Sequence, residues 1–133
     1  MPKALPSVLY TCEQTRQLDA LAITQENIPG IQLMKRAGTA AFKTLLNVWP
    51  QVERLLVLCG SGNNGGDAYI VAALAAQRNV VVELYACSDA DQLKGDAAKA
   101  KDFALSQGLE IRSLGDLSFA QNDHGFTVVG DKF

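Results

Sequence analysis

Apolar residues recur at helical spacing over the first 50 residues of the chain and then change to short continuous runs. Thr11 and Gln14 have the spacing of a capping box, which predicts a first helix from Thr11 to about Ile23. Apolar positions between Leu33 and Val48 step every three or four residues and predict a longer amphipathic helix. We expect these two helices to form an N-terminal layer packed on whatever sheet follows.

The continuous apolar runs predict buried strands. The run Leu55–Cys59 contains no polar residue, which is typical of a strand buried on both faces of a parallel sheet. The later predicted elements are a helix at Ala68–Arg78, a strand at Val80–Tyr85, a helix from Ser88 to Gln107, a short strand at Glu110–Ser113 and a next strand at Phe126–Val129. This alternation predicts an α/β fold, a Rossmann-like parallel sheet with helices on both faces and an N-terminal two-helix extension.

Composition agrees with a single globular domain spanning residues 1–133. Hydrophobic residues make up 48% of the 133 and charged residues 20%. The formal net charge of -2 leaves no basic surface for nucleic acid. No apolar run approaches the roughly 18 to 20 residues that span a bilayer, so we expect no membrane partner.

Cysteine usage and the N-terminus predict a cytoplasmic protein. Cys12, Cys59 and Cys87 are odd in number and include no CxxC pair, which argues against a disulfide framework and against a zinc site. No long apolar run follows Lys3, so no secretory signal is expected.

The segment Gly60–Asp67 stands where ligands bind in open α/β sheets, between a strand and the following helix. Its glycines allow close backbone approach, and the next helix directs free N–H groups at the segment, which suits phosphate. The carbonyl oxygens of Asn63 and Asn64 can coordinate a monovalent cation, and Asp67 can cap the helix or accept from a ribose hydroxyl. The alternative is an ordinary glycine-rich surface turn with Asp67 as its N-cap.

A second interpretation is a fragment of an NAD-dependent oxidoreductase. Gly60, Gly62 and Gly65 satisfy G-x-G-x-x-G, and Glu83 lies near the position of the acid that binds ribose in that fingerprint. However, the strand is predicted to continue past Glu83, whereas the fingerprint's acid ends its strand. The paired asparagines are also no part of the fingerprint, so this interpretation is disfavoured.

The segment Gly62–Asp67 after a buried strand resembles the signature of the YjeF N-terminal domain family, the NAD(P)H-hydrate epimerases. Tyr10–Asp19 is similar to the opening helix of that family, and Leu33–Gly38 is similar to its second-helix motif. The resemblance covers about residues 8 to 86. It implies an isomerase that interconverts the R and S forms of hydrated NADH and NADPH, with a potassium ion as cofactor. The residues that it implies bind the dinucleotide are Asn63, Asn64, Gly65, Gly66 and Asp67, and it implies that Asn64 also holds the potassium.

The resemblance identifies no catalytic residue here, because the family's acid comes from a later segment. Asp131 takes that place only if the register slips by one residue, and Ala68 and Lys35 stand where the family has glycine and an acid. We therefore expect the domain to lack its C-terminal part. A second candidate function is a non-catalytic nucleotide-binding or interaction module that keeps the loop. Expected partners are the dinucleotide, a dehydratase that is fused or separate, and a second copy in a homodimer, since apolar surface near Val128 is predicted to be exposed.

Overall fold

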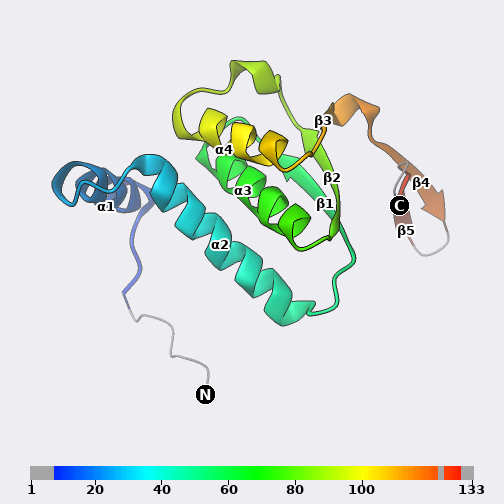
Figure 1. Cartoon of the computed structure of the whole chain (residues 1–133), viewed down its shortest axis with the longest axis horizontal. Coiled ribbons are helices and arrows are strands. Elements are labelled where there is room, and N and C mark those ends of the chain that lie inside the picture. Colours follow the sequence, from blue (N-terminus) through cyan, green and yellow to red (C-terminus); the bar gives the residue numbers. More distant parts are fainter. Residues whose placement is uncertain (1–7, 123–124, 130–133) are drawn as a thin grey trace.

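A computed structural model of the chain describes residues 8–122 and 125–129. Its elements are shown in Figure 1. They are α1 (Cys12–Gln25), α2 (Gly30–Val48), β1 (Arg54–Cys59), α3 (Asn63–Gln77), β2 (Val81–Ala86), the 3-10 turn η1 (Ala90–Gln92), α4 (Gly95–Ser106), β3 (Ile111–Ser113), the 3-10 turn η2 (Leu114–Asp116), β4 (Ser118–Asn122) and β5 (Gly125–Val129).

Strands β1, β2 and β3 form a parallel sheet in that order, which confirms the α/β fold class. In β1, Val57 pairs with Leu84 of β2, and Leu84 pairs with Ile111 of β3. Alternate residues of each strand point to opposite faces, so these three side chains share one face. That face is the one that builds the hydrophobic core.

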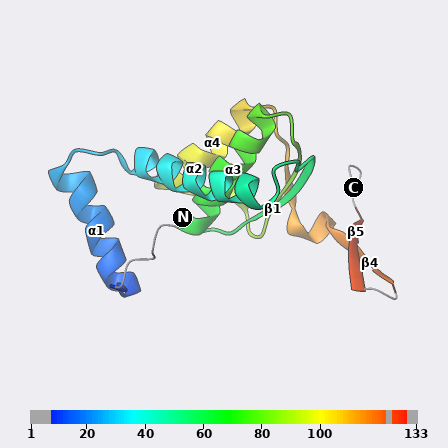
Figure 2. The ribbon, with the colours of Figure 1, turned by 90° about the horizontal axis from the view of Figure 1, so that it is seen from below.

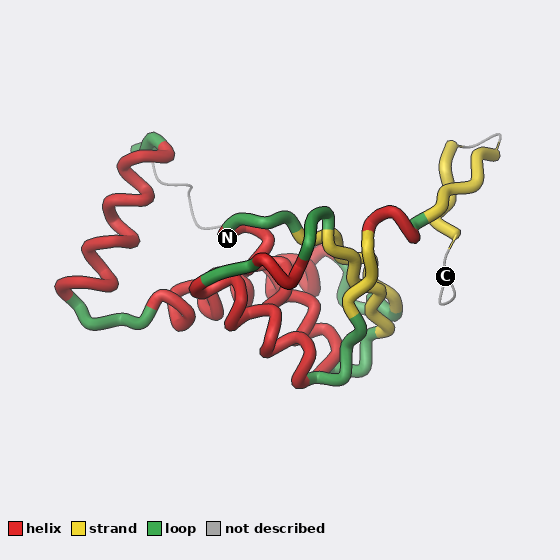
Figure 3. The backbone as a smooth tube through the Cα atoms, turned by 90° about the horizontal axis from the view of Figure 1, so that it is seen from above, coloured by secondary structure: helices red, strands yellow, loops and turns green. Residues whose placement is uncertain are grey.

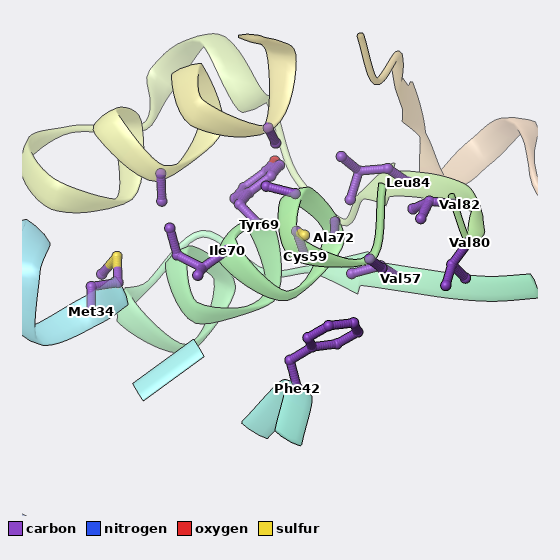
Figure 4. Packing of buried hydrophobic residues seen from close by; sticks show 14 residues of the cluster. Met34, Phe42, Val57, Cys59, Tyr69, Ile70, Ala72, Val80, Val82 and Leu84 are labelled. Carbon is purple, nitrogen blue, oxygen red and sulfur yellow. The ribbon is translucent and has the colours of Figure 1, made fainter. Parts of the chain in front are cut away.

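Helices α2, α3 and α4 pack together on this face of the sheet, as Figure 3 shows. Helix α3 lies between the other two and buries Tyr69, Ile70 and three alanines. Figure 4 shows Phe42 of α2 and Val57 of β1 in the same cluster. The small side chains of α3 let α2, α4 and the sheet approach closely. Helix α3 therefore contacts both the neighbouring helices and the strands.

The opposite face of the sheet differs from the prediction of helices on both faces. Of the described helices, α2, α3 and α4 all pack on the core face. Leu58 of β1, which shares the opposite face with its partner Tyr85, is 47% exposed. The same face holds the buried Glu83, whose carboxylate oxygen lies 3.8 Å from a guanidinium nitrogen of Arg112. Strand β1 is therefore less covered than its apolar sequence predicts.

Helix α1 begins as predicted, but it does not join the helical layer. Thr11 accepts a hydrogen bond from the Gln14 N–H, and the Gln14 side chain accepts one from the Thr11 N–H, which confirms the capping box. No residue of α1 is buried, and Leu18 and Leu21 are exposed. Figure 2 shows α1 projecting away from the other helices. Only α2 forms the N-terminal layer that packs on the sheet.

The predicted start of α4 at Ser88 is wrong by seven residues, since the helix begins at Gly95. The intervening chain forms η1, whose Asp91 N–H donates to the Asp89 carboxylate at 3.0 Å. A local side-chain acceptor thus stabilises a short 3-10 turn in competition with the longer helix.

Strand β5 exists where Phe126–Val129 was predicted, but it does not extend the parallel sheet. It pairs antiparallel with β4 in a separate two-stranded sheet, visible apart from the main sheet in Figure 3. Joining a parallel neighbour requires a long crossover, whereas the two residues between β4 and β5 suit a hairpin. The position of Asp131 and the side chain of Val128 lie outside the described parts of the structure.

No helix within the described ranges is long and apolar enough to cross a membrane.

Candidate functional site

The junction between β1 and α3 is shorter than the sequence predicts. Helix α3 begins at Asn63, so Asn63–Asp67 forms its first turn and a half, and only Gly60–Gly62 remains as a loop. Gly62 is the N-cap, and no side chain in the described part of the chain caps the helix. Asp67, expected as a cap, is the fifth helical residue and lies past the positions that cap. The first N–H groups of α3 are therefore left for solvent or a ligand.

Two buried glycines hold this junction together. A Cβ atom on Gly65 would collide with the carbonyl oxygen of Gly60, and one on Gly66 would lie 2.5 Å from the Met34 sulfur. The Gly65 contact is with backbone and requires the absence of a side chain, whereas at Gly66 the end of the Met34 side chain would have to move. Gly65 and Gly66 thus act in the packing of the helix start against the loop and against α2.

Three of the five predicted site residues, Asn63, Asn64 and Asp67, line a common hollow of about 270 Å³. Helices α1, α2 and α4 supply the rest of its wall. The other lining residues are Asp19, Ile23, Gly30, Leu33, Met34, Ala37 and Asp96. The structure therefore brings together side chains from four helices beside the N-terminus of α3.

The hollow is acidic. Burial, and after it the nearby Asp19, raises the pKa of the Asp67 carboxyl above its ordinary value of 3.8. Asp96 of α4 is a third carboxyl that lines the hollow. This arrangement repels anions, favours a cation or a hydroxyl donor, and gives Asp67 an increased tendency to hold a proton.

The helix N-terminus beside this hollow has the opposite electrostatic character. The uncapped N–H groups at the start of α3 and the positive end of the helix dipole attract anions such as phosphate. The first two turns of α3 thus offer an anion-binding end and a carboxylate-lined side.

Sequence reasoning missed the contributions of Asp19 and Asp96 to this hollow. Asp96 lies near the start of α4, where one of its carboxylate oxygens is 3.9 Å from the Lys99 ammonium nitrogen. Its place in the hollow depends on how α4 packs against α3 and α2, which no local pattern reveals. Asp19 belongs to a segment that the sequence singled out only for its resemblance.

A metal ion in this hollow would be held by oxygen atoms of the lining side chains. Within the described ranges, no group of three or more His, Cys, Asp or Glu side chains is arranged to hold a metal. The amide oxygens of Asn63 and Asn64 and the Asp67 carboxylate nevertheless line one wall. Oxygen ligands of this kind suit a hard cation.

The position of Glu83 argues against the oxidoreductase interpretation. It lies within β2, is 3% exposed and is paired with Arg112. A carboxylate enclosed on the sheet face away from the helices does not reach a ribose at the strand end. Glu83 is therefore a structural residue.

The fold and this site together define a class of protein, a Rossmann-like α/β domain with a ligand hollow at the junction of a strand and a helix. Residues 30–129 match the family described as "YjeF-related protein N-terminus". The chain belongs to this family.

Similar proteins extend well beyond the matched region. The chain is 43% identical over 105 residues to "Bifunctional NAD(P)H-hydrate repair enzyme Nnr" of Coxiella burnetii, covering 79% of this chain and 21% of that protein. It is 36% identical over 106 residues to "NAD(P)H-hydrate epimerase" of Rhodopirellula baltica, covering 80% and 43%. The crystal structure of yeast ynu0 (YNL200c) matches with a TM-score of 0.69 at 16% identity, covering 80% of this chain and 47% of that one, which shows the fold. This chain thus spans less than half the length of each.

Replacing Gly65 by Ala tests the close contact at the junction. The added methyl group collides with the Gly60 backbone, so we expect the free energy of unfolding to fall by about 1–3 kcal/mol in urea titrations. The matched control is Gly60→Ala, because a Cβ atom there meets none of the described residues within 4 Å. We expect the control to change stability by less than about 1 kcal/mol. Equal losses in the two variants would contradict the assignment.

The raised pKa of Asp67 predicts a pH-dependent stability. Because the folded state disfavours the Asp67 carboxylate, its contribution to stability falls as pH rises from the ordinary value of 3.8 toward the raised pKa. We expect Asp67→Asn to melt above the wild type at neutral pH, with the difference narrowing below about pH 4. Asp19→Asn should give part of the same gain, because Asp19 contributes to the shift. A neutral-pH melting temperature below that of the wild type in Asp67→Asn would refute this.

Proposed function

We propose that the protein is an NAD(P)H-hydrate epimerase, an isomerase that interconverts the R and S forms of hydrated NADH and NADPH in the repair of nicotinamide cofactors. The observation that carries this proposal is the convergence of Asn63, Asn64 and Asp67 on one hollow beside an uncapped helix N-terminus. The printed names of the relatives support it, since one is an NAD(P)H-hydrate epimerase and another an NAD(P)H-hydrate repair enzyme.

In this proposal, the start of α3 holds the dinucleotide by its phosphates. The free N–H groups of Asn63, Asn64 and Gly65 bind phosphate oxygens, while Gly66 keeps the helix close to α2. Asp67 faces the hollow and accepts from a ribose hydroxyl. Its raised pKa also favours a proton on this carboxyl, and we propose that Asp67 exchanges that proton with the hydrated ring.

We also propose a potassium ion at Asn64, with the oxygens of Asn63 and Asp67 beside it. The support is chemical, because the amide and carboxylate oxygens on this wall match the preference of a hard cation. The ion would offset the repulsion between the acidic wall and a negatively charged dinucleotide.

A second candidate is a non-catalytic nucleotide-binding or interaction module. The hollow supplies groups that bind, but none of the described residues that line it is a lysine or a histidine able to share proton transfer with the carboxyls. The chain also spans 43% of the epimerase from Rhodopirellula baltica. Binding without turnover would favour this candidate.

The remaining parts of the proposal concern the protein's setting. We propose that residues 1–133 belong to one domain of this family and that the protein acts in the cytoplasm on a small molecule. A dehydratase, fused or separate, is the proposed partner that uses the S form. The bifunctional relatives at 43% and 36% identity support a link between the two activities.

A conversion assay tests the epimerase proposal. The chain is expected to bind hydrated NADPH and to accelerate conversion of the R form to the S form, with a higher rate in potassium than in choline salts. Asn64→Ala and Asp67→Ala should each weaken binding at least about tenfold, because each removes a polar contact. Asn47→Ala and Asp102→Ala, at exposed helical positions elsewhere, are matched controls. If neither binding nor conversion occurs, or if all four variants behave alike, the proposal fails.

Exposed apolar residues on α1 support the proposal of a homodimer. Leu18, Leu21 and Ile23 are 50%, 46% and 41% exposed, and α1 buries no residue. Sedimentation velocity should show dimers at increasing concentration, and the double substitution Leu18→Glu and Leu21→Glu should shift the protein to monomer. Gln17→Glu adds charge at an exposed position of α1 and should leave the dimer intact. A wild type that stays monomeric throughout would contradict self-association.

A further inference from the structure

Two of the three cysteines lie at the carboxyl ends of neighbouring parallel strands. Cys59 is the last residue of β1 and is 1% exposed, while Cys87 directly follows β2 and is exposed. The third cysteine, Cys12, is exposed at the start of α1. Parallel pairing, which matches Cys59 with Ala86, therefore brings together two thiol residues that are 28 positions apart in the sequence.

The backbone fixes the distance between these two residues. The Cys87 N–H donates a hydrogen bond to the Cys59 carbonyl oxygen at 2.8 Å. Standard bond lengths on either side of that hydrogen bond limit the separation of the two Cα atoms to at most about 6.7 Å. Disulfides usually join cysteines whose Cα atoms are about 4.4 to 6.8 Å apart. The Cα separation of the pair thus lies within the range that disulfides occupy.

The surroundings of the thiols agree with this proximity. Burial, and after it Cys87, raises the pKa of the Cys59 thiol to about 12. Burial, followed by Cys59 and then Cys87, also raises the pKa of Tyr69 to about 12. Both thiols therefore lie within electrostatic reach of the same hydroxyl. Figure 4 shows Cys59 and Tyr69 together in the core cluster.

Of the two thiol residues, Cys87 is accessible to solvent and Cys59 is not. Cys87 lines an open hollow of about 1140 Å³ at the carboxyl ends of β2 and β3, whereas Cys59 is enclosed. The chain bends at Cys87, after the end of β2, so strand alternation no longer fixes the side to which its thiol points. An oxidant in solution meets Cys87 first, and Cys59 is the neighbouring thiol that can react next.

We infer that Cys59 and Cys87 form an oxidisable dithiol, a modification site that closes to an intramolecular disulfide on reaction with a hydroperoxide. The Cys87 thiolate attacks the peroxide, the O–O bond breaks, and a sulfenic acid and an alcohol are formed. The Cys59 sulfur then attacks the sulfenic sulfur, an S–S bond forms and the S–O bond breaks, and the Cys59 thiol proton joins the departing hydroxyl group as water. Two thiols and one hydroperoxide thus give one disulfide, one alcohol and one water.

The disulfide would stand directly before the glycine loop. Cys59 precedes Gly60, whose carbonyl contacts Gly65 in the first turn of α3. A covalent link between β1 and β2 at this point fixes the strand ends on which that contact is built. The inference itself does not depend on the proposed epimerase function, because disulfide formation is measured without a nucleotide.

The experiment oxidises the folded chain with tert-butyl hydroperoxide, blocks the remaining thiols and maps the peptides by mass spectrometry. We expect the free thiols to fall from three to one per chain, with a single Cys59–Cys87 cross-link that a reducing agent reverses. Cys12→Ser is the matched control and should form the same cross-link.

Two variants make the test decisive. Cys87→Ser changes an exposed residue and should fold as the wild type does, while losing the cross-link completely. Cys59→Ala should also lose it, and circular dichroism of both variants reports folding. A cross-link that includes Cys12, that joins two chains, or that forms only in denaturant would overturn the inference, as would persistence of all three thiols under the same oxidation.

Discussion

The close contact between the Gly60 carbonyl and the Cα of Gly65 is the constraint on which the site and the core both depend. It brings the first turn of α3 against the end of β1, with no room for a side chain between them. From that start, α3 continues between α2 and α4 and buries Tyr69 and Ile70 against the sheet. The direction of the central helix and the position of its free N–H groups thus have one common cause.

The same few residues separate two electrostatic environments. The uncapped N-terminus of α3 attracts anions, while Asp67, Asp19 and Asp96 make the adjoining hollow acidic. A dinucleotide carries phosphates and hydroxyl groups at different places, so a site with both characters can orient it as well as bind it. Asn63 and Asn64 lie where the two environments meet, and an amide side chain can donate to one and accept from the other.

The sequence predicted those features that local patterns determine. The capping box at Thr11 and the strands at Leu55–Cys59 and Val80–Tyr85 each follow from residues close together in the chain, and the structure confirms them. The start of α3 was predicted five residues late, because Asn, Gly and Asp are weak helix formers. Packing against Met34 compensates for that weakness, and this contact is visible only in three dimensions.

Strand β5 illustrates the opposite case, in which the element was predicted but not its partner. A run such as Phe126–Val129, which is apolar except for Thr127, predicts a strand, but the strand with which it pairs depends on which other segment can reach it. Strand β4 lies two residues away and forms the antiparallel pair. Pairing with β4 closes only a short loop and therefore costs little conformational entropy. This low cost outweighs the preference of an apolar strand for a buried sheet.

The two faces of the main sheet contribute unequally to holding the site in place. On the face away from the helices, Leu58 is 47% exposed, and the buried Glu83 carboxylate lies 3.8 Å from the partly exposed Arg112 guanidinium. The carboxylate oxygens of Glu83 have no hydrogen-bond partner among the described residues. The helix-facing core, with Val57, Val82 and Leu84, therefore stabilises β1 and β2 together with the buried Tyr85 of the opposite face. Helix α3 belongs to that core, and its first turn packs against the end of β1. A change at Gly65 or at Cys59 therefore affects both the site and the stability of the sheet.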